Sequence, residues 1–266
     1  NETESLVKTY QNTLPITYLS EAQPGKNNAL NKGLPYATGD ILVFTDDDVL
    51  VKPNWLIELK SGFERHPTYS LFGGSIKPHY PDTPVDPRIN LKHHFISDAY
   101  VITDPRLEEK EIRAGKIWGP NMAIRRELID KGFTFNPNIG PNGQDYIMGS
   151  ETEFLMRASE AGYKSMFIPS AIVLHQIREN QLNLKWLAAR AYRQGKGDAA
   201  KAHYSSKETS FFLGAPRFMY KKMIVHALLM AKSTFTLSPK SYFSHLIRFN
   251  FIKGQIAEYT RVSKIR

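Results

Sequence analysis

The sequence predicts an α/β protein in which helices flank a mostly parallel sheet. Short continuous apolar runs, such as ILVF at residues 41–44, are typical of strands buried on both faces. Segments with a helical period of apolar residues separate these runs, and strands that alternate with helices build a parallel sheet. A chain of 266 residues is long enough to bury such a sheet beneath its helices.

The periodicity of apolar residues predicts the helices and strands, and Gly and Pro residues mark where they begin and end. Pro53, for example, predicts a helix start, because proline suits the first helical turn. Helices are expected at residues 2–12, 27–37, 53–66, 151–161 and from 184 onward. Strands are expected at residues 16–19, 41–45, 71–76, 117–124, 165–168 and 172–174. Five prolines and mixed charge predict that residues 78–115 run over the surface.

The net charge of +9 lies entirely in the last part of the chain. Residues 211–266 hold ten Lys and Arg but one acid, Glu258, whereas residues 1–210 are neutral overall. A neutral body with a basic, aromatic-rich tail favours an anionic membrane surface over nucleic acid, which is not an expected partner. The absence of cysteine excludes disulfides, thiol nucleophiles and Cys-ligated zinc.

The tail has the pattern of a surface helix rather than a membrane-spanning one. No window reaches the ~18 apolar residues that a spanning helix needs. One helical face collects Met219, Met223, Ile224, Ala227 and Met230, and another collects Arg217, Lys221 and Lys232. Further apolar residues follow at Tyr242, Phe243, Leu246, Ile247, Phe249, Phe251 and Ile252. We expect residues 181–266 to be a membrane-associating region beside a core of residues 1–180, although a basic helix docked on its own domain fits the pattern too.

Three adjacent acids, Asp46, Asp47 and Asp48, follow the apolar run that ends at Thr45. Neighbouring carboxylates repel one another unless a cation neutralises them. Ligands of open α/β sheets bind at the carboxyl ends of strands, and oxygen ligands there suit Mg²⁺ or Mn²⁺. A helix N-cap is the structural alternative, but a cap needs only one Asp.

Four ordered motifs give this pattern a family resemblance. They are PGKNNALNKG at 24–33, GDILVFTDDD at 39–48, WGPNMAIRR at 118–126 and GSETEFLMR at 149–157. Together they resemble glycosyltransferase family 2, which has the GT-A fold, a DxD motif after a strand and an acidic pair at a helix start.

The resemblance implies transfer of a sugar, with inversion, from a nucleotide-diphosphate donor such as a UDP-sugar to an acceptor hydroxyl. The acceptor is then a glycan or a lipid-linked sugar of a cell-surface polysaccharide or glycolipid, and the enzyme lies at the cytoplasmic face of the membrane. A non-catalytic, membrane-docked binding protein with a degenerate GT-A core remains the alternative, because Ser150 stands where the family often has an acid.

The resemblance also assigns roles to individual residues. Glu151 is the expected general base, and its alternative is an ordinary first-turn helix acid. Asp48, Asp46 and His175 are the expected ligands of Mn²⁺ or Mg²⁺. Lys26, Asp46, Asp47 and Arg193 are expected at the donor, and Trp118, Asn121 and Glu153 at the acceptor or sugar.

Family members normally begin with a strand, a helix and a second strand that help to hold the nucleotide. The first residues here correspond to the segment after that unit. We therefore expect residues 1–266 alone to bind a donor nucleotide poorly.

Overall fold

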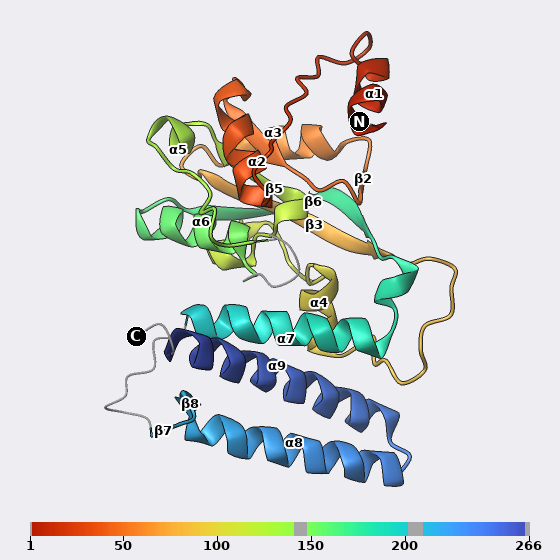
Figure 1. Ribbon diagram of the computed structural model, residues 1–266. Helices are drawn as coiled ribbons and strands as arrows, with labels where there is room; N and C mark the ends of the chain where they lie inside the picture. Colours follow the sequence, from red (N-terminus) through yellow and green to blue (C-terminus); the bar gives the residue numbers. More distant parts are fainter. Residues whose placement is uncertain (1, 141–147, 202–209, 264–266) are drawn as a thin grey trace.

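The computed structural model describes residues 2–140, 148–201 and 210–263, and within these ranges it contains a six-stranded sheet (Figure 1). The path of neighbouring strands runs β1-β5-β3-β6-β2, and β4 also pairs with β6. The strands are β1 Ile41–Phe44, β2 Val49–Val51, β3 Leu71–His79, β4 Lys110–Glu111, β5 Met122–Arg125 and β6 Ser165–Gln176.

The predicted α/β class is confirmed, and the sheet is mixed in its pairing. β3 and β6 pair in parallel along the whole of β3, with a register shift between Gly74 and Ser75. β5 pairs antiparallel with both β1 and β3, so β1, β3 and β6 run in the same direction and contain most of the strand residues. β2 and β4 each pair antiparallel with β6.

Helices cover both faces of the sheet. On one face, α3 Trp55–Arg65 packs Leu59 and Phe63 against Phe72. On the other face lie α2 Lys26–Gly33, α5 Glu127–Asp130 and α6 Ser150–Glu160, and their apolar residues surround Met122 and Ile124. Because side chains alternate across a strand, β5 contributes to both cores, with Ala123 in the first and its neighbours in the second. α1 Glu2–Tyr10 has no buried residue.

A separate layer of helices lies below the sheet. It contains α4 His94–Tyr100, α7 Leu184–Lys201, α8 Arg217–Phe235 and α9 Pro239–Ser263. α9 lies between α7 and α8 in Figure 1, and a short hairpin of β7 Phe211–Phe212 and β8 Ala215–Pro216 precedes α8. Phe95 and Tyr100 of α4 share one apolar cluster with Leu187 of α7 and Phe243 of α9. The division at residue 180 stays a prediction, although this cluster joins residues from both sides of it.

Several predicted strands differ from those observed. Residues 16–19 are not a strand, because no partner strand pairs with them among the described residues and none of the four is buried. The strand expected at 117–124 begins only at Met122, after the 3₁₀ turns η2 Ala114–Lys116 and η3 Gly119–Asn121. The two strands expected at 165–168 and 172–174 are one strand, β6, and β2 was not predicted.

The expected course of two other segments also needs correction. Residues 78–115 are not only a surface excursion, since α4 within them is buried against α7 and α9. In the tail, Phe243, Ile247 and Ile252 are buried, so this stretch does not offer them to a membrane. Met219 is buried as well, whereas Ile224 is 57 % exposed, so the predicted apolar face is divided between the protein and solvent. No helix within the described ranges has both the length and the apolar character needed to cross a membrane.

Two glycines allow α7 and α9 to approach closely. A Cβ atom at Gly195 would lie 2.0 Å from the carbonyl oxygen of Phe251, and one at Gly254 would lie 2.0 Å from that of Tyr192. Real Cβ atoms do not come this close to backbone oxygens, so a larger residue forces the helices apart. Each glycine makes helix formation less favourable by about 1 kcal/mol relative to alanine, and the close packing of α7 and α9 offsets this cost.

We predict that Gly254→Ala destabilises the protein by about 2–3 kcal/mol, because the extra methyl group strains the α7–α9 contact. Gly33→Ala is the matched control: it lies in α2, has a helical φ of −74°, and its Cβ would meet no atom within 4 Å. That control is expected to stabilise by about 0.5–1 kcal/mol. Urea unfolding measures both, and equal effects would contradict the role given to close packing.

Candidate functional site

A cavity of about 550 Å³ lies between one end of the sheet and the helical layer. It collects residues from the turn after β1, the starts of α2 and α6, the end of β6, and helices α4 and α7. The predicted site residues among its lining are Lys26, Asp46, Asp47, Asp48, Trp118, Glu151 and His175. The fold thus brings into one cavity predicted site residues as far apart in the chain as Lys26 and His175.

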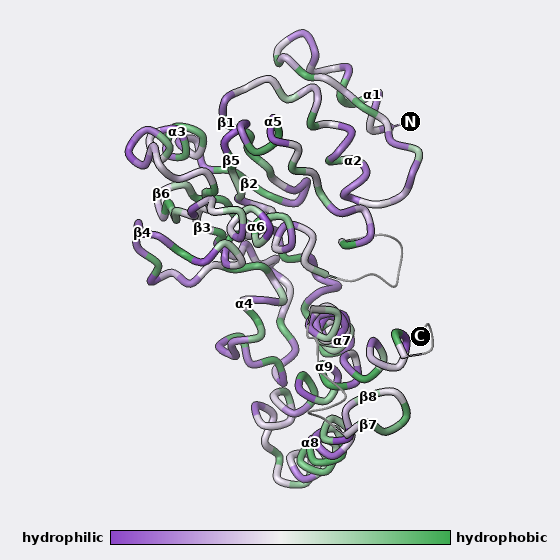
Figure 2. The backbone as a smooth tube through the Cα atoms, turned by 90° about the vertical axis from the view of Figure 1, so that its left-hand side faces the viewer, coloured by the Kyte–Doolittle hydropathy of each residue, from purple (hydrophilic) through white to green (hydrophobic). Residues whose placement is uncertain are grey.

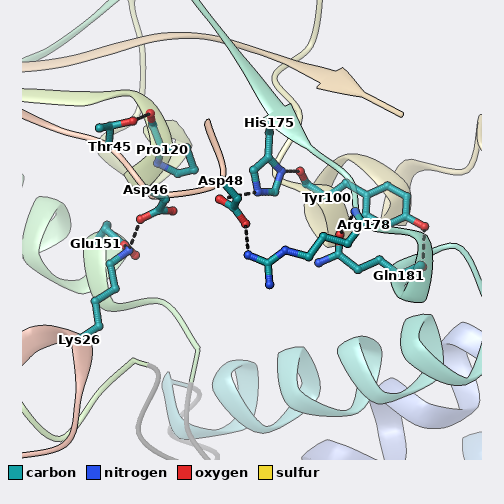
Figure 3. A network of polar contacts seen from close by, with 10 residues as sticks. All are labelled: Lys26, Thr45, Asp46, Asp48, Tyr100, Pro120, Glu151, His175, Arg178 and Gln181. Atoms are coloured by element: carbon teal, nitrogen blue, oxygen red, sulfur yellow. Dashed lines mark hydrogen bonds and ion pairs between the residues drawn. The ribbon is translucent and has the colours of Figure 1, made fainter. Parts of the chain in front are cut away.

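The pairing of β2 with β6 fixes Asp48 beside His175. Val49 lies opposite His175 in this ladder, and the backbone N–H of Gln176 donates to the carbonyl oxygen of Asp48 at 2.9 Å. Asp48 Oδ1 consequently lies 3.5 Å from His175 Nε2, and Asp48 Oδ2 lies 3.4 Å from Arg178 Nη2 (Figure 3). The antiparallel ladder therefore positions one acid of the triplet against the strand-end histidine.

The histidine has a defined orientation. Its Nδ1 lies 2.6 Å from the carbonyl oxygen of Tyr100, which can only accept, so Nδ1 carries a proton and donates (Figure 3). In the neutral ring, Nε2 is then unprotonated, and its lone pair faces the carboxylate of Asp48. Two acceptors that face each other suit a cation between them, and a backbone bond to the remote nitrogen is typical of metal-binding histidines.

The donor set fits a divalent cation that takes further ligands from a substrate. Among the described residues, no group of three or more His, Asp or Glu side chains is close enough to hold a metal. Asp48 and His175 would therefore supply two ligands. Mg²⁺ and Mn²⁺ sites that serve phosphate substrates commonly have one or two protein carboxylates and fill the other positions with phosphate and water.

Lys26 connects the acidic turn to α6. Its Nζ lies 2.8 Å from Asp46 Oδ1 and 2.5 Å from Glu151 Oε1 (Figure 3). Burial lowers the pKa of this ammonium group, but the carboxylates of Glu151 and Asp46 raise it by more, so its pKa stands above that of a free lysine. The group is consequently charged at physiological pH, and it neutralises part of the repulsion between the two acids. Gly25 precedes it with φ 126°, a conformation that favours glycine.

Glu151 enters the cavity from the first turn of α6. Gly149, with φ 106°, turns the chain into this helix, whose N-terminal dipole stabilises a carboxylate. Space for the side chain depends on Gly119, because a Cβ atom there would lie 2.4 Å from Glu151 Oε1. Ser150, the departure from the family pattern, is buried and donates to Asn27 Oδ1, so it joins α6 to α2.

The family model for glycosyl transferase family 2 matches residues 1–133, which is half of the chain. The chain belongs to this family. It is 30 % identical over 206 residues to the succinoglycan biosynthesis protein ExoM of Rhizobium meliloti, a match over 75 % of this chain. It is 24 % identical over 182 residues to the glycosyltransferase AglE of Haloferax volcanii, over 67 % of this chain. The matched regions span 62 % and 52 % of those two relatives.

A solved structure agrees with the architecture. The structure of the mannosyltransferase PcManGT from Pyrobaculum calidifontis, a complex with GDP-Man and Mn²⁺, superposes with a TM-score of 0.53 at 18 % identity. The match covers 94 % of this chain and 73 % of that one. The expected GT-A fold is therefore confirmed for this family 2 chain.

Three predicted site residues lie elsewhere than expected. Within the described part of the chain, the cavity lining does not include Asn121, Glu153 or Arg193. Glu153 pairs with Arg157 at 2.6 Å on its own helix. Arg193 is replaced in the lining by Arg190, one turn earlier on α7.

Asn121 belongs to a buried structural network, and its expected sugar contact stays a prediction. It is fully buried, its Oδ1 accepts from Trp55 Nε1 at 2.9 Å, and its Nδ2 donates to the carbonyl oxygens of Ser75 and Ala171. These bonds hold η3 against β3, β6 and α3. The side chain has no polar atom directed to the cavity, because its amide groups are used inside the protein.

Several lining residues were missed from the sequence. Asp98 and Tyr100 come from α4, and Arg190 and Gln194 come from α7. Trp186 stacks on Tyr100 with ring centroids 5.6 Å apart. Neither helix carries a local motif, and only their packing into one cluster brings them to the cavity. Arg178 was also missed, although its position three residues after His175 could have indicated a shared role.

We predict that Asn121→Ala destabilises the protein by about 3 kcal/mol, because it leaves an indole N–H and two buried carbonyl groups without partners. Glu153→Ala, which removes a partly exposed ion pair, is expected to change stability by less than about 1 kcal/mol. Urea unfolding compares the two. A stable Asn121→Ala protein that had lost only substrate affinity would instead support the predicted sugar-binding role.

Proposed function

We propose that this family 2 chain is an inverting glycosyltransferase that transfers a sugar from a nucleotide-diphosphate donor to an acceptor hydroxyl. Glu151 is the general base, and Asp48 and His175 hold a divalent cation. One observation carries this proposal: a single cavity contains Glu151 and the Asp48–His175 pair, and the Lys26 ammonium lies between Glu151 and Asp46.

The residues of the cavity can meet the two demands of the reaction. Departure of a nucleoside diphosphate develops negative charge, and a cation at Asp48 and His175 would stabilise it as a Lewis acid. Lys26 in the cavity and Arg178, which pairs with Asp48, add positive charge beside the acids and can bind phosphate oxygens. The Glu151 carboxylate, in the first turn of α6 and beside Lys26, can accept the proton of an acceptor hydroxyl.

Donor and acceptor classes are supported by the relatives. PcManGT was solved with GDP-Man and Mn²⁺, and ExoM is named for the biosynthesis of a polysaccharide. We propose a nucleotide-diphosphate sugar as donor, with UDP- and GDP-sugars as the first to test. The proposed acceptor is a glycan or lipid-linked sugar of a cell-surface polysaccharide or glycolipid. The proposed place of reaction is the cytoplasmic face of the membrane, where the protein is peripheral.

We expect Glu151→Gln to lower turnover by about 10²- to 10⁴-fold, because glutamine keeps the shape but cannot take up a proton. The measurement is release of nucleoside diphosphate from UDP- and GDP-sugars, with a membrane extract as the source of acceptor. Glu153→Gln is the matched control, since it alters an acid two residues away that pairs with Arg157 outside the cavity. Equal activity of Glu151→Gln and wild type would remove Glu151 as base. Donor binding by the wild type without any turnover would favour the non-catalytic alternative.

We expect Asp48→Asn and His175→Gln each to weaken Mn²⁺ binding at least about tenfold, because each removes one of two protein ligands. Mn²⁺ binding is measured by electron paramagnetic resonance in the presence of nucleoside diphosphate, and EDTA should stop the transfer. Asp104→Asn, at a surface Asp paired with Arg106, serves as the control. Unchanged Mn²⁺ affinity in both site variants would place the cation elsewhere.

A further inference from the structure

The outer face of α8 carries apolar side chains that contact little of the described protein. The inner side of α8 packs on α9, where Met219 and Ser233 are buried and His226 Nδ1 lies 3.2 Å from His245 Nδ1. α8 is the outermost helix of the layer (Figures 1 and 2). Ile224, Val225 and Leu228 on its outer side are 57 %, 51 % and 66 % exposed. Large apolar side chains grouped on one exposed face indicate a partner surface.

Two exposed leucines flank α8 in the chain, one before it and one after it. Leu213 lies at the tip of the β7–β8 hairpin before α8, and Leu237 follows the C-cap residue of α8; they are 71 % and 88 % exposed. Both have left-handed backbones, with φ of 46° and 49°. Gly or Asn is preferred at such positions, so leucine there costs conformational free energy. Neither side chain is buried, so packing of the leucine side chains in the described chain does not compensate that cost.

Basic residues surround the apolar ones. Arg217, Lys221, Lys222 and Lys232 on α8 and Lys240 at the start of α9 are all exposed. In the described residues 210–263, the one acid is Glu258, which is buried and pairs with Arg261. The face therefore combines apolar tips with positive charge that no exposed acid balances.

We propose that this face, defined as Leu213, Ile224, Val225, Leu228, Phe235 and Leu237 with the surrounding lysines, docks on an anionic lipid bilayer. Apolar tips enter the headgroup region while lysines reach anionic headgroups with their ammonium groups. This inference names the surface behind the proposed membrane location, and it does not depend on the chemistry at Glu151.

Charge complementarity favours a lipid surface over a second copy of the chain and over nucleic acid. A second copy docked through the same face would bring the five basic residues against five like charges, because a two-fold interface is self-complementary. Nucleic acid would meet the lysines but would leave the leucine tips without an apolar partner. An anionic bilayer satisfies both kinds of side chain.

The direct test is co-sedimentation of the chain with phosphatidylcholine vesicles that contain or lack 30 % phosphatidylglycerol, without donor or metal. We expect binding to the anionic vesicles to be at least tenfold tighter and to weaken with salt. Lys221→Gln with Lys232→Gln should weaken it about fivefold for each lysine. Lys60→Gln on α3, an exposed lysine on another face, should leave it unchanged.

The sharper test is Leu213→Asn combined with Leu237→Asn. Asparagine suits the left-handed backbone, so this variant should unfold at a higher temperature and yet bind anionic vesicles at least tenfold more weakly. A leucine pair with only a structural role predicts lower stability and unchanged binding. Leu56→Asn with Ile57→Asn, which removes two exposed apolar side chains from α3, should keep full vesicle binding.

Three results would overturn the proposal. One is equal binding to neutral and anionic vesicles. Another is undiminished binding by the Leu213 and Leu237 variant. The third is a dimer in analytical ultracentrifugation that this variant abolishes. Each of them leaves the transferase proposal untouched, since the latter is measured by release of nucleoside diphosphate.

Discussion

The convergence of carboxylates on one cavity is the constraint around which this structure is arranged. Asp46 and Glu151 would repel each other across a partly buried space, and the Lys26 ammonium lies within hydrogen-bond distance of both. Lys26 reaches both acids because α2 begins beside the acidic turn, and the backbone conformation of Gly25 permits this start. Glu151 has room in the cavity because its neighbour Gly119 has no side chain. The Asp48 carboxylate is met separately, by His175 and Arg178. Neighbouring acids without the positive charges of Lys26 and Arg178 would cost free energy of folding.

A second constraint is the close approach of the helices below the site. α7 forms one wall of the cavity, and its position depends on α9, which meets it through Gly195 and Gly254. α9 in turn supports α8, whose outer face is free of the other helices (Figure 1). The basic tail thus has two roles by position: its buried residues hold the wall of the site, and its exposed residues form the proposed membrane surface.

Much of the fold could be predicted from local pattern. The apolar run at 41–44 is β1, the segment after Pro53 is α3, and the segment with Glu151 in its first turn is α6. The errors fall where pairing partners decide the outcome. Residues 16–19 have strand-like composition but no partner among the described strands, and β2 is too short to be recognised without β6 beside it. α4 lies in a proline-rich segment, and its burial depends on α7 and α9 from far along the chain.

By itself, the sequence determined the α/β class, the family and the place of the acidic turn, because these depend on residue types within short windows. It also located the surplus positive charge in residues 211–266. Only the tertiary structure decided which residues meet: it placed Asp48 against His175 through the β2–β6 register, buried Asn121 in a structural network, and put Arg190 rather than Arg193 in the cavity. It likewise decided that Phe243 is buried and that Leu237 is exposed. The physical reason is that side-chain role depends on which distant backbone lies opposite, and that is set by ladder register and helix packing rather than by the local pattern.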